Sequence, residues 1–309
     1  MSVKLSVVVA IVSDTTSGHC DTSHLEGTLQ SLAAQIDPPS MEIVVPHHSA
    51  IAGITELKAR YPKVRFIPVD NLKTFTGRGG SREHHDELRV HGLKVACGEL
   101  IALIEDHGRA APHWSASLAA AHKKDTAAVG GAIENGVDRP LNWAVYFCDF
   151  GKYQNPVPAG ETAFASDANV AYKRSALDAI KPVWKEVFHE TSVNWALREH
   201  GGKLVLSPDM VLYQHRLGLR LGDALRERFT WGRSYAATRG RTAGFVKRMA
   251  YAALSPLLPA VLLMRMAANV ARKGRCIAPF LKALPLTALL AVSWSCGEFT
   301  GYLTGRATG

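Results

Sequence analysis

The sequence predicts an α/β protein: a doubly wound, mostly parallel (mixed) sheet in a first domain, then a basic, apolar helical region. Three observations support this. Apolar segments of strand length alternate with helix-period segments over the first 70 residues. A polar cluster directly follows the apolar segment Leu100–Ile104. Finally, the chain from Arg216 on contains 15 Lys and Arg against 3 Asp and Glu, whereas the part before it contains 21 against 24. We therefore divide the chain into residues 1–218 and 219–309.

The first elements follow from local patterns. A near-continuous apolar run is typical of a strand buried on both faces of a parallel sheet, and leucines spaced three and four apart are typical of a helix. The strands and helices expected in this region are, in chain order, Leu5–Val12, His24–Gln35, Met41–Val45, Ile51–Tyr61 and Val64–Val69. No GxGxxG motif opens the first helix, which argues against a dinucleotide-binding domain.

Composition limits the class of protein. Hydrophobic residues make up 47% of the chain, which is enough for a large core, and the five cysteines form no CxxC pair. This cysteine pattern argues against a zinc ribbon or a disulfide framework and favours a reducing compartment. The apolar amino terminus lacks a small-residue cleavage site, so we interpret it as the first strand.

The polar cluster Glu105-Asp106-His107 lies at the expected carboxyl end of a buried strand. In open α/β sheets, ligands bind at this edge. Carboxylate oxygens and an imidazole suit Mg²⁺ or Mn²⁺ bridging phosphates. The alternative is an ordinary polar exit from a strand.

A long polar segment, Asn71–Glu87, is expected to be a loop. It contains Gly77, Gly79 and Gly80 around Arg78. Arg78 and Arg82 are candidates for contact with a diphosphate, because arginine forms paired hydrogen bonds with phosphate. A flexible, charged surface loop is the alternative.

These central segments resemble the family 2 glycosyltransferases, which have the glycosyltransferase A fold. The family pattern is Ala-Arg-Asn-x-Gly-Leu, then Ala-x-Gly-Glu, then an apolar strand ending in Asp-x-Asp. The residues in that register here are Arg89, Gly92-Leu93, Ala96, Gly98-Glu99 and Glu105-Asp106-His107. The resemblance makes Arg89 a candidate donor-binding residue. Val90 departs from the pattern, and so does Glu105-x-His107, which suggests a subgroup with Glu-Asp-His. The resemblance implies an inverting sugar transferase that uses a nucleotide-diphosphate donor and a divalent metal.

The resemblance also implies roles for particular residues. Glu190 falls on the second member of the family's Glu-Asp pair, the general base; the alternative is a first-turn acidic residue favoured by the helix dipole. Asp167 and Asn169 fall on a turn that contacts donor or acceptor. His215 falls on a histidine that approaches the metal or diphosphate, although a lone histidine is more often structural.

The donor-binding residues are less completely matched. Family members usually carry an Asp that reads uracil after the second strand, where this chain has His47. The donor nucleotide therefore stays open, with Asp14 as a candidate contact to base or ribose. Arg228 and Trp231 lie where processive members have Arg/Gln-x-x-Arg-Trp, but the Arg-Trp pairing is missing. A basic helix facing lipid headgroups is the alternative there.

The carboxyl-terminal region combines positive charge with apolar segments. Met249–Met264 and Ala283–Gly297 contain no charged residue, and each is shorter than the about 20 residues that span a bilayer. Pro256, Pro259 and Pro285 interrupt them. We expect helices that lie in or dip into the cytoplasmic leaflet, held by apolar burial and by attraction to anionic lipid. The alternative is a helical subdomain packed on the first domain or on a second subunit.

The leading interpretation is thus a membrane-associated glycosyltransferase. Its partners would be a nucleotide-sugar donor and a lipid, lipid-linked or polysaccharide acceptor, with no nucleic acid and with oligomerisation possible. A non-catalytic scaffold with the same fold is the main alternative, motivated by the departures at Val90, His47 and His107. A nucleotidyltransferase is a third, although it lacks a glycine-rich phosphate loop before the first helix.

Overall fold

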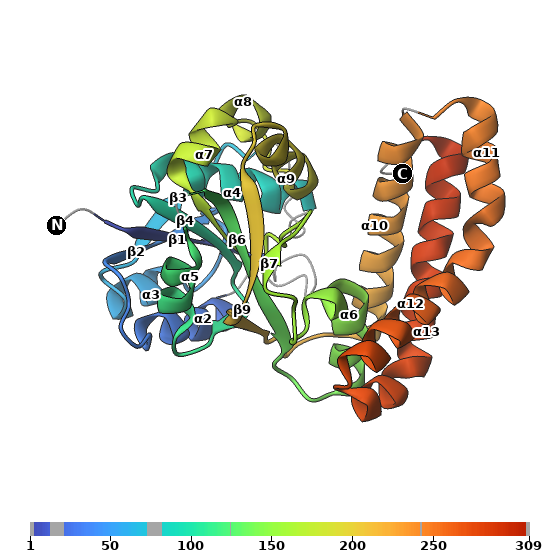
Figure 1. Cartoon of the computed structure of the whole chain (residues 1–309), viewed down its shortest axis with the longest axis horizontal. Coiled ribbons are helices and arrows are strands. Elements are labelled where there is room, and N and C mark those ends of the chain that lie inside the picture. Colours follow the sequence, from blue (N-terminus) through green and yellow to red (C-terminus); the bar gives the residue numbers. More distant parts are fainter. Residues whose placement is uncertain (1–2, 13–21, 73–81, 124, 242, 307–309) are drawn as a thin grey trace. The chain divides into compact units, whose positions relative to one another are not determined.

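The computed structural model describes the chain except residues 1–2, 13–21, 73–81, 124, 242 and 307–309. It divides into two compact units (Figure 1). The sheet unit comprises Met1–Gly136 and Tyr153–Arg216. The helical unit comprises Val137–Lys152 and Leu217–Gly309, so it includes a segment that the sequence analysis placed in residues 1–218.

The strands of the sheet unit form one mixed sheet in the order β3-β2-β1-β4-β8-β6-β9-β5, with β7 paired to β9. Their bounds are β1 Leu5–Ala10, β2 Met41–His47, β3 Arg65–Pro68, β4 Leu100–Glu105, β5 Gly108–Ala110, β6 Thr126–Asn135, β7 Gly160–Glu161, β8 Asn169–Lys173 and β9 Lys203–Gln214. The first three strands and β4 pair in parallel, as does β6 with β9, and the remaining pairs are antiparallel. The predicted α/β class with a mixed sheet is confirmed.

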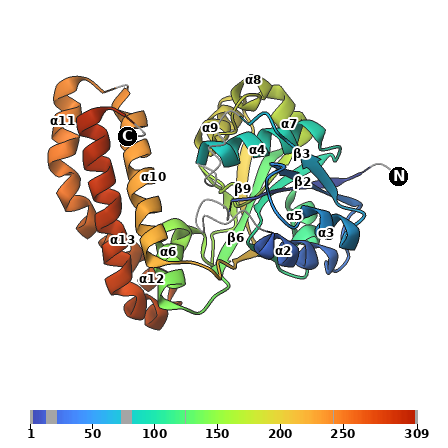
Figure 2. The same cartoon turned by 180° about the vertical axis from the view of Figure 1, so that it is seen from behind.

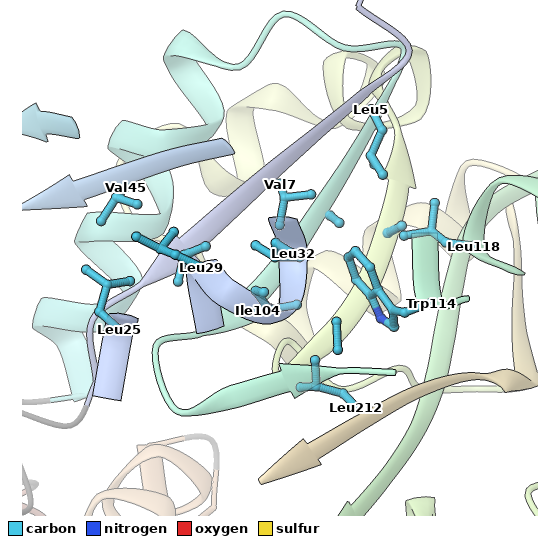
Figure 3. Close-up of a cluster of buried hydrophobic side chains, with 14 of the residues drawn as sticks. Leu5, Val7, Leu25, Leu29, Leu32, Val45, Ile104, Trp114, Leu118 and Leu212 are labelled. Carbon is cyan, nitrogen blue, oxygen red and sulfur yellow. The ribbon is translucent and has the colours of Figure 1, made fainter. Parts of the chain in front are cut away.

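Helices cover both faces of this sheet. Their bounds are α2 Ser23–Ala33, α3 Ile54–Arg60, α4 Arg82–Val95, α5 Trp114–Ala121, α7 Arg174–Ala179, α8 Lys181–Trp184 and α9 Glu190–Glu199. The 3₁₀ turn η1, Gly151–Tyr153, contains the point where the chain passes from the helical unit back to the sheet unit. Alternate residues of β1 point to opposite faces, as strand geometry requires. Val7 and Val9 join Leu29 of α2 in one core, whereas Val8 joins Val90 of α4 in another. Figure 3 shows the first of these cores, with Trp114 of α5 beside Leu212 of β9.

Helix α4 begins earlier in the chain than the sequence predicts. Residues 82–87 were expected to belong to a loop, but they form the first turns of the helix. Two glycines of the family-like motif explain how this helix meets the sheet. A Cβ at Gly92 would collide with Val8, and one at Gly98 would collide with the backbone around Ser6. Both glycines therefore allow a close approach of chain segments to β1.

The helical unit contains α6 Pro140–Asp149, α10 Leu221–Arg241, α11 Phe245–Leu254, η2 Ser255–Leu257, α12 Leu258–Lys273 and α13 Ile277–Thr304. Within this unit, α13 packs against α6, α10, α11 and α12 (Figure 2). Its core includes Ala144, Ala224 and Leu290.

Two stretches of the helical unit are long and apolar enough to cross a membrane, judged by length and composition alone. They are Phe245–Lys273 and Ile277–Thr304, of 29 and 28 residues. Both are longer than the sequence predicts. The first consists of α11, η2 and α12 in direct succession, and the second is the single helix α13. Pro256 and Pro259 lie in first turns, where a proline's missing N–H costs little, and Pro285 lies inside α13.

Candidate active site

Arg89 of α4 is the centre of a buried charge cluster. Its residue is 3% exposed, and its guanidinium lies 2.9 Å from Asp86, 3.2 Å from Asp167 and 3.5 Å from Glu105. Burial alone would lower the pKa of Arg89, but the carboxylates around it raise the pKa instead. The cation thus holds together acidic side chains from three separate segments of the chain.

Glu190 belongs to the same cluster. It is the first residue of α9, and its Oε2 accepts a hydrogen bond of 3.3 Å from the backbone N–H of Asp167. The Glu190 carboxylate also interacts electrostatically with Arg89. The structure therefore brings together Glu190, Asp167 and Arg89, which the sequence analysis had named separately.

Two tyrosines border these carboxylates. Tyr153 and Tyr172 are 4% and 0% exposed. Burial raises the pKa of both phenols, and the charges of Glu190 and Asp167 raise it further. Both side chains are therefore neutral hydroxyl groups at physiological pH. No sequence signal pointed to these tyrosines, because neither lies in a polar motif.

Asp86 was also missed, because it fell in the expected loop. The spacing Asp86-x-x-Arg89 was a usable signal, since residues three apart on a helix are neighbours. Its carboxylate is 6% exposed and pairs with Arg89. Once residues 82–87 are helical, this pair follows from the sequence.

At the carboxyl end of β4, Glu105 and His107 form an ion pair. His107 Nε2 lies 3.3 Å from Glu105 Oε2. Burial alone would raise the pKa of Glu105, but the hydrogen bond and charge of His107, with Arg89, lower it to about 2. Burial would lower the pKa of His107, but hydrogen bonds to Asp106 and Glu105 raise it to about 9.

Asp106 differs from its two neighbours. It is 0% exposed, and its Oδ1 accepts a hydrogen bond of 3.0 Å from the backbone N–H of Val12. Its carbonyl accepts another from Thr28 Oγ1. This carboxylate ties the end of β1 to the end of β4. Its burial argues against the predicted direct contact with a metal ion.

Within the described residues, no group of three or more His, Cys, Asp or Glu side chains is arranged to hold a metal alone. Glu105 and His107 remain as two adjacent donors, an oxygen and a nitrogen. Mg²⁺ bound with a nucleotide commonly takes only one or two protein ligands and completes its shell with phosphate oxygens and water. A two-ligand site of this chemistry therefore fits a metal brought in with a diphosphate.

Asn169 has a structural role. It is 0% exposed, its Nδ2 donates to the carbonyls of Ala132 and Met210 at 2.9 Å each, and its Oδ1 accepts from Trp114 Nε1 at 2.8 Å. These bonds join β8 to β6, β9 and α5. Because its amide is used inside the sheet unit, this geometry argues against the predicted ligand contact.

His215 follows β9 and lies beside the strand end that carries His107. Its backbone N–H donates to the carbonyl of His107 at 2.8 Å. A Cβ at Gly136 would collide with its imidazole, so the ring rests on that glycine. Burial lowers the pKa of His215, and the charges of Arg109, His107 and His24 lower it further.

His47 is the residue that aligns with the uracil-contacting Asp of the family 2 glycosyltransferases. It ends β2, is 4% exposed, and its Nδ1 lies 3.1 Å from the carbonyl of His48. Burial lowers its pKa. A mostly buried, neutral imidazole therefore occupies the end of β2.

The remaining predicted residues are Arg228, Trp231, Asp14, Arg78 and Arg82. Arg228 belongs to the helical unit, is 3% exposed, and both its terminal nitrogens bind the carboxylate of Asp149, one at 2.7 Å. Trp231 lies 4.5 Å from the Arg228 guanidinium. This burial argues against direct donor binding by Arg228. Asp14 and Arg78 lie outside the described residues, as does the side chain of Arg82.

Comparisons with known proteins address the fold. The mannosyltransferase PcManGT from Pyrobaculum calidifontis, solved in complex with GDP-Man and Mn²⁺, matches with a TM-score of 0.54 and 16% identity, over 96% of this chain and 87% of that one. S. aureus TarS matches with a TM-score of 0.49 and 14% identity, over 78% of this chain and 40% of that one. Residues 1–349 of TarS with UDP match with a TM-score of 0.47 and 13% identity, over 94% of this chain and 91% of that one.

The fold of this chain is thus that of a solved glycosyltransferase. The assignment rests on the mannosyltransferase, because the TarS scores are below 0.5. No protein-family model matches the sequence, and no curated protein matches it.

Proposed function

We propose that this protein is an inverting glycosyltransferase. It moves a sugar from a nucleotide-diphosphate donor to a lipid, lipid-linked or polysaccharide acceptor. The fold it shares with a mannosyltransferase that binds GDP-Man supports this class of reaction. Fold likeness alone does not assign chemistry, so the proposal depends on the site.

The position of Glu190 carries the proposal. The carboxylate is held by the Asp167 N–H and lies close enough to Arg89 to interact with it, beside the strand end that bears Glu105. In the proposed reaction, Glu190 takes the proton of the acceptor hydroxyl. The acceptor oxygen then bonds to the anomeric carbon as that carbon's bond to the diphosphate oxygen breaks, and the nucleoside diphosphate leaves. General base catalysis of this kind contributes about 10²–10⁴-fold.

Glu105 and His107 are the residues that would hold a divalent cation, Mg²⁺ or Mn²⁺. When bound, the ion supplies positive charge that stabilises the departing diphosphate. The mannosyltransferase of similar fold was solved with Mn²⁺, which supports this part of the proposal. Because His107 pairs with Glu105, the imidazole must lose its proton before it can bind a metal.

The proposed site of action is the cytoplasmic surface of a membrane. Large apolar side chains of the helical unit are exposed, among them Phe245 at 68%, Val246 at 81% and Met264 at 64%. The region also carries the excess of Lys and Arg described above. Apolar side chains combined with positive charge favour an interface with anionic lipid.

Turnover of a panel of nucleotide sugars tests the proposal. The full chain should hydrolyse or transfer at least one sugar in Mn²⁺ or Mg²⁺ and lose that activity in EDTA. Glu190→Gln should reduce turnover by about 10²-fold or more and leave donor binding within a few-fold.

Glu186→Gln is the matched control, because Glu186 is an exposed carboxylate four residues earlier in the same segment. It should retain turnover. If Glu190→Gln also retained turnover, Glu190 would not be the base. A chain that bound no nucleotide sugar, with or without metal, would instead favour the non-catalytic scaffold.

A further inference from the structure

Arg109 of β5 is a half-buried cation that has no acidic partner among the described residues. Within the described part of the chain, no carboxylate lies within ion-pair distance of its guanidinium, and no hydrogen bond to it is formed. Burial lowers its pKa, and no negative charge from the described residues offsets that effect. An arginine nevertheless stays protonated in proteins, so this charge is permanent. Burying an uncompensated charge costs free energy, which an anionic ligand would recover.

Imidazole groups lie near Arg109. The charges that act on His215 come from Arg109, His107 and His24, and none of them is a carboxylate. The His24 and His107 rings lie 6.4 Å apart between centroids, and His24 Nδ1 lies 3.2 Å from the carbonyl of His215. Three histidines from α2, the end of β4 and the end of β9 therefore gather near one guanidinium. Arg109, His24 and His215 are each partly exposed.

A glycine fixes the position of the guanidinium. A Cβ built on Gly27 of α2 would coincide with the guanidinium of Arg109. The missing side chain therefore leaves the space that the guanidinium fills. The guanidinium of Arg109 therefore lies against α2 at Gly27 and is not merely extended into solvent.

We infer that Arg109, with His24 and His215, binds a phosphate group. This inference rests on the proposed function, because it names the part of the substrate that this edge of the sheet would hold. Arginine suits the role through paired, charge-assisted hydrogen bonds to phosphate oxygens. The phosphate belongs either to the donor diphosphate or to a lipid acceptor, and the chemistry of recognition is the same in both.

Ligand binding is measured in EDTA, so that any contribution of a bound metal ion to phosphate affinity is removed. The full chain is titrated with UDP, GDP and pyrophosphate, and with uridine and guanosine as probes that lack phosphate. Arg109→Gln should weaken binding of at least one phosphate probe by about ten-fold or more and leave nucleoside binding unchanged. Arg109→Lys should weaken it less, because lysine retains the charge without the paired geometry.

Two further variants control the experiment. Gly27→Ala keeps every charge but displaces the guanidinium, so it should weaken phosphate binding as Arg109→Gln does. Arg60→Gln removes another arginine, which pairs with Glu26 of α2 at the surface, and should bind like the unmodified chain. If Gly27→Ala does not fold, the Arg109 pair of variants still decides.

Flotation with vesicles of phosphatidylcholine and phosphatidic acid (4:1) distinguishes the two sources of phosphate. Weaker nucleotide or pyrophosphate binding in Arg109→Gln with unchanged flotation assigns the site to the donor. Weaker flotation with unchanged soluble-ligand binding assigns it to a lipid phosphate. If neither changes, the inference is overturned. If the unmodified chain transfers sugar although Arg109→Gln changes neither kind of binding, only the phosphate inference fails and the proposed function stands. If Arg109→Gln loses phosphate binding but the unmodified chain transfers no sugar, the phosphate site stands and only the proposed function fails.

Discussion

At the scale of single residues, Arg89 combines stability and chemistry. Its buried guanidinium forms ion pairs with Asp86, Glu105 and Asp167. Four charges in one buried cluster are costly unless each is compensated. The carboxylates proposed to act on substrate therefore depend on a residue that need not touch it.

The first prediction concerns this cluster. Arg89→Met should lower the free energy of unfolding by about 3–5 kcal/mol, because it leaves buried carboxylates without their cation. Arg60→Gln, at an exposed ion pair whose side chains are 52% and 30% exposed, should change it by about 0–1 kcal/mol. Urea denaturation of both variants measures the difference. A loss of less than about 1 kcal/mol in Arg89→Met would contradict the buried-cluster account.

The second prediction concerns pH. Glu42 accepts hydrogen bonds of 2.6 Å each from Ser6, Arg65 and the backbone of Cys97. Burial raises the pKa of Glu42, but these partners together hold it below its ordinary value. Since the folded-state pKa is lower than the unfolded one, the contribution of Glu42 is complete above the unfolded pKa. It is lost as pH falls through the folded pKa.

Glu42→Gln should therefore lower the unfolding free energy by about 1–3 kcal/mol at neutral pH and by less below about pH 4. Denaturation curves at several pH values give the comparison. Glu56→Gln, at an exposed position of α3, is the control. Its unfolding free energy should differ little from that of the unmodified chain at any of these pH values. A difference between the Glu42 variant and the unmodified chain that stayed constant down to acid pH would contradict the mechanism.

The sequence specified which residues matter better than it specified what they do. Glu190, Asp167, Arg89 and Glu105 were all named in advance, and the structure places them in one cluster. The roles of polar residues such as Asn169 could not be predicted from the sequence. Whether an amide faces ligand or interior depends on partners far away in sequence, such as Trp114.

At the scale of elements, α4 shows the limit of local patterns. Its first turns are rich in charged and histidine residues, so hydrophobic periodicity gave no helix signal there. His84 and Leu88 are nonetheless 0% exposed. Polar residues that become buried through long-range pairing look like loop residues in a single sequence. The strands β1 to β4, whose apolar runs are local, were located within a few residues.

The third prediction concerns the contact of α10 with α13. A Cβ at Gly297 of α13 would collide with the backbone of α10 at Phe229 and Arg233. Backbone cannot move aside as a flexible side chain can, so Gly297→Ala should force the helices apart and cost about 1–3 kcal/mol. Gly222→Ala in α10 is the matched control, because a Cβ there meets open space.

The pair is measured by thermal denaturation in detergent or lipid. Gly222→Ala should leave the midpoint within a few degrees or raise it, since alanine favours a helix more than glycine does. If both variants behaved alike, the close approach of these helices would not contribute to stability.

At the scale of the whole molecule, the fourth prediction tests membrane binding. The double variant Phe245→Glu with Val246→Glu changes two highly exposed side chains, so it should fold normally. It should bind vesicles containing anionic phospholipid at least about ten-fold more weakly, because it removes apolar contact area and adds negative charge.

Val187→Glu, in the sheet unit, is the control, since Val187 is 44% exposed. It should float with vesicles as the unmodified chain does. Equal flotation of all three proteins would contradict the proposal that these helices meet lipid, and would favour a helical subdomain that covers its apolar side chains with protein.

The early position of α6 in the chain has a consequence for biosynthesis. Val137–Lys152 leaves the ribosome long before α13, the helix on which its aromatic face packs. Phe147 and Phe280, whose rings end 5.0 Å apart, are separated by most of the second half of the chain. During synthesis the apolar face of α6 therefore lacks its partner helix until α13 has been made, which favours binding of this segment to a chaperone or to the membrane. We expect a nascent chain arrested before Ile277 to bind chaperones or membranes more strongly than the completed protein does.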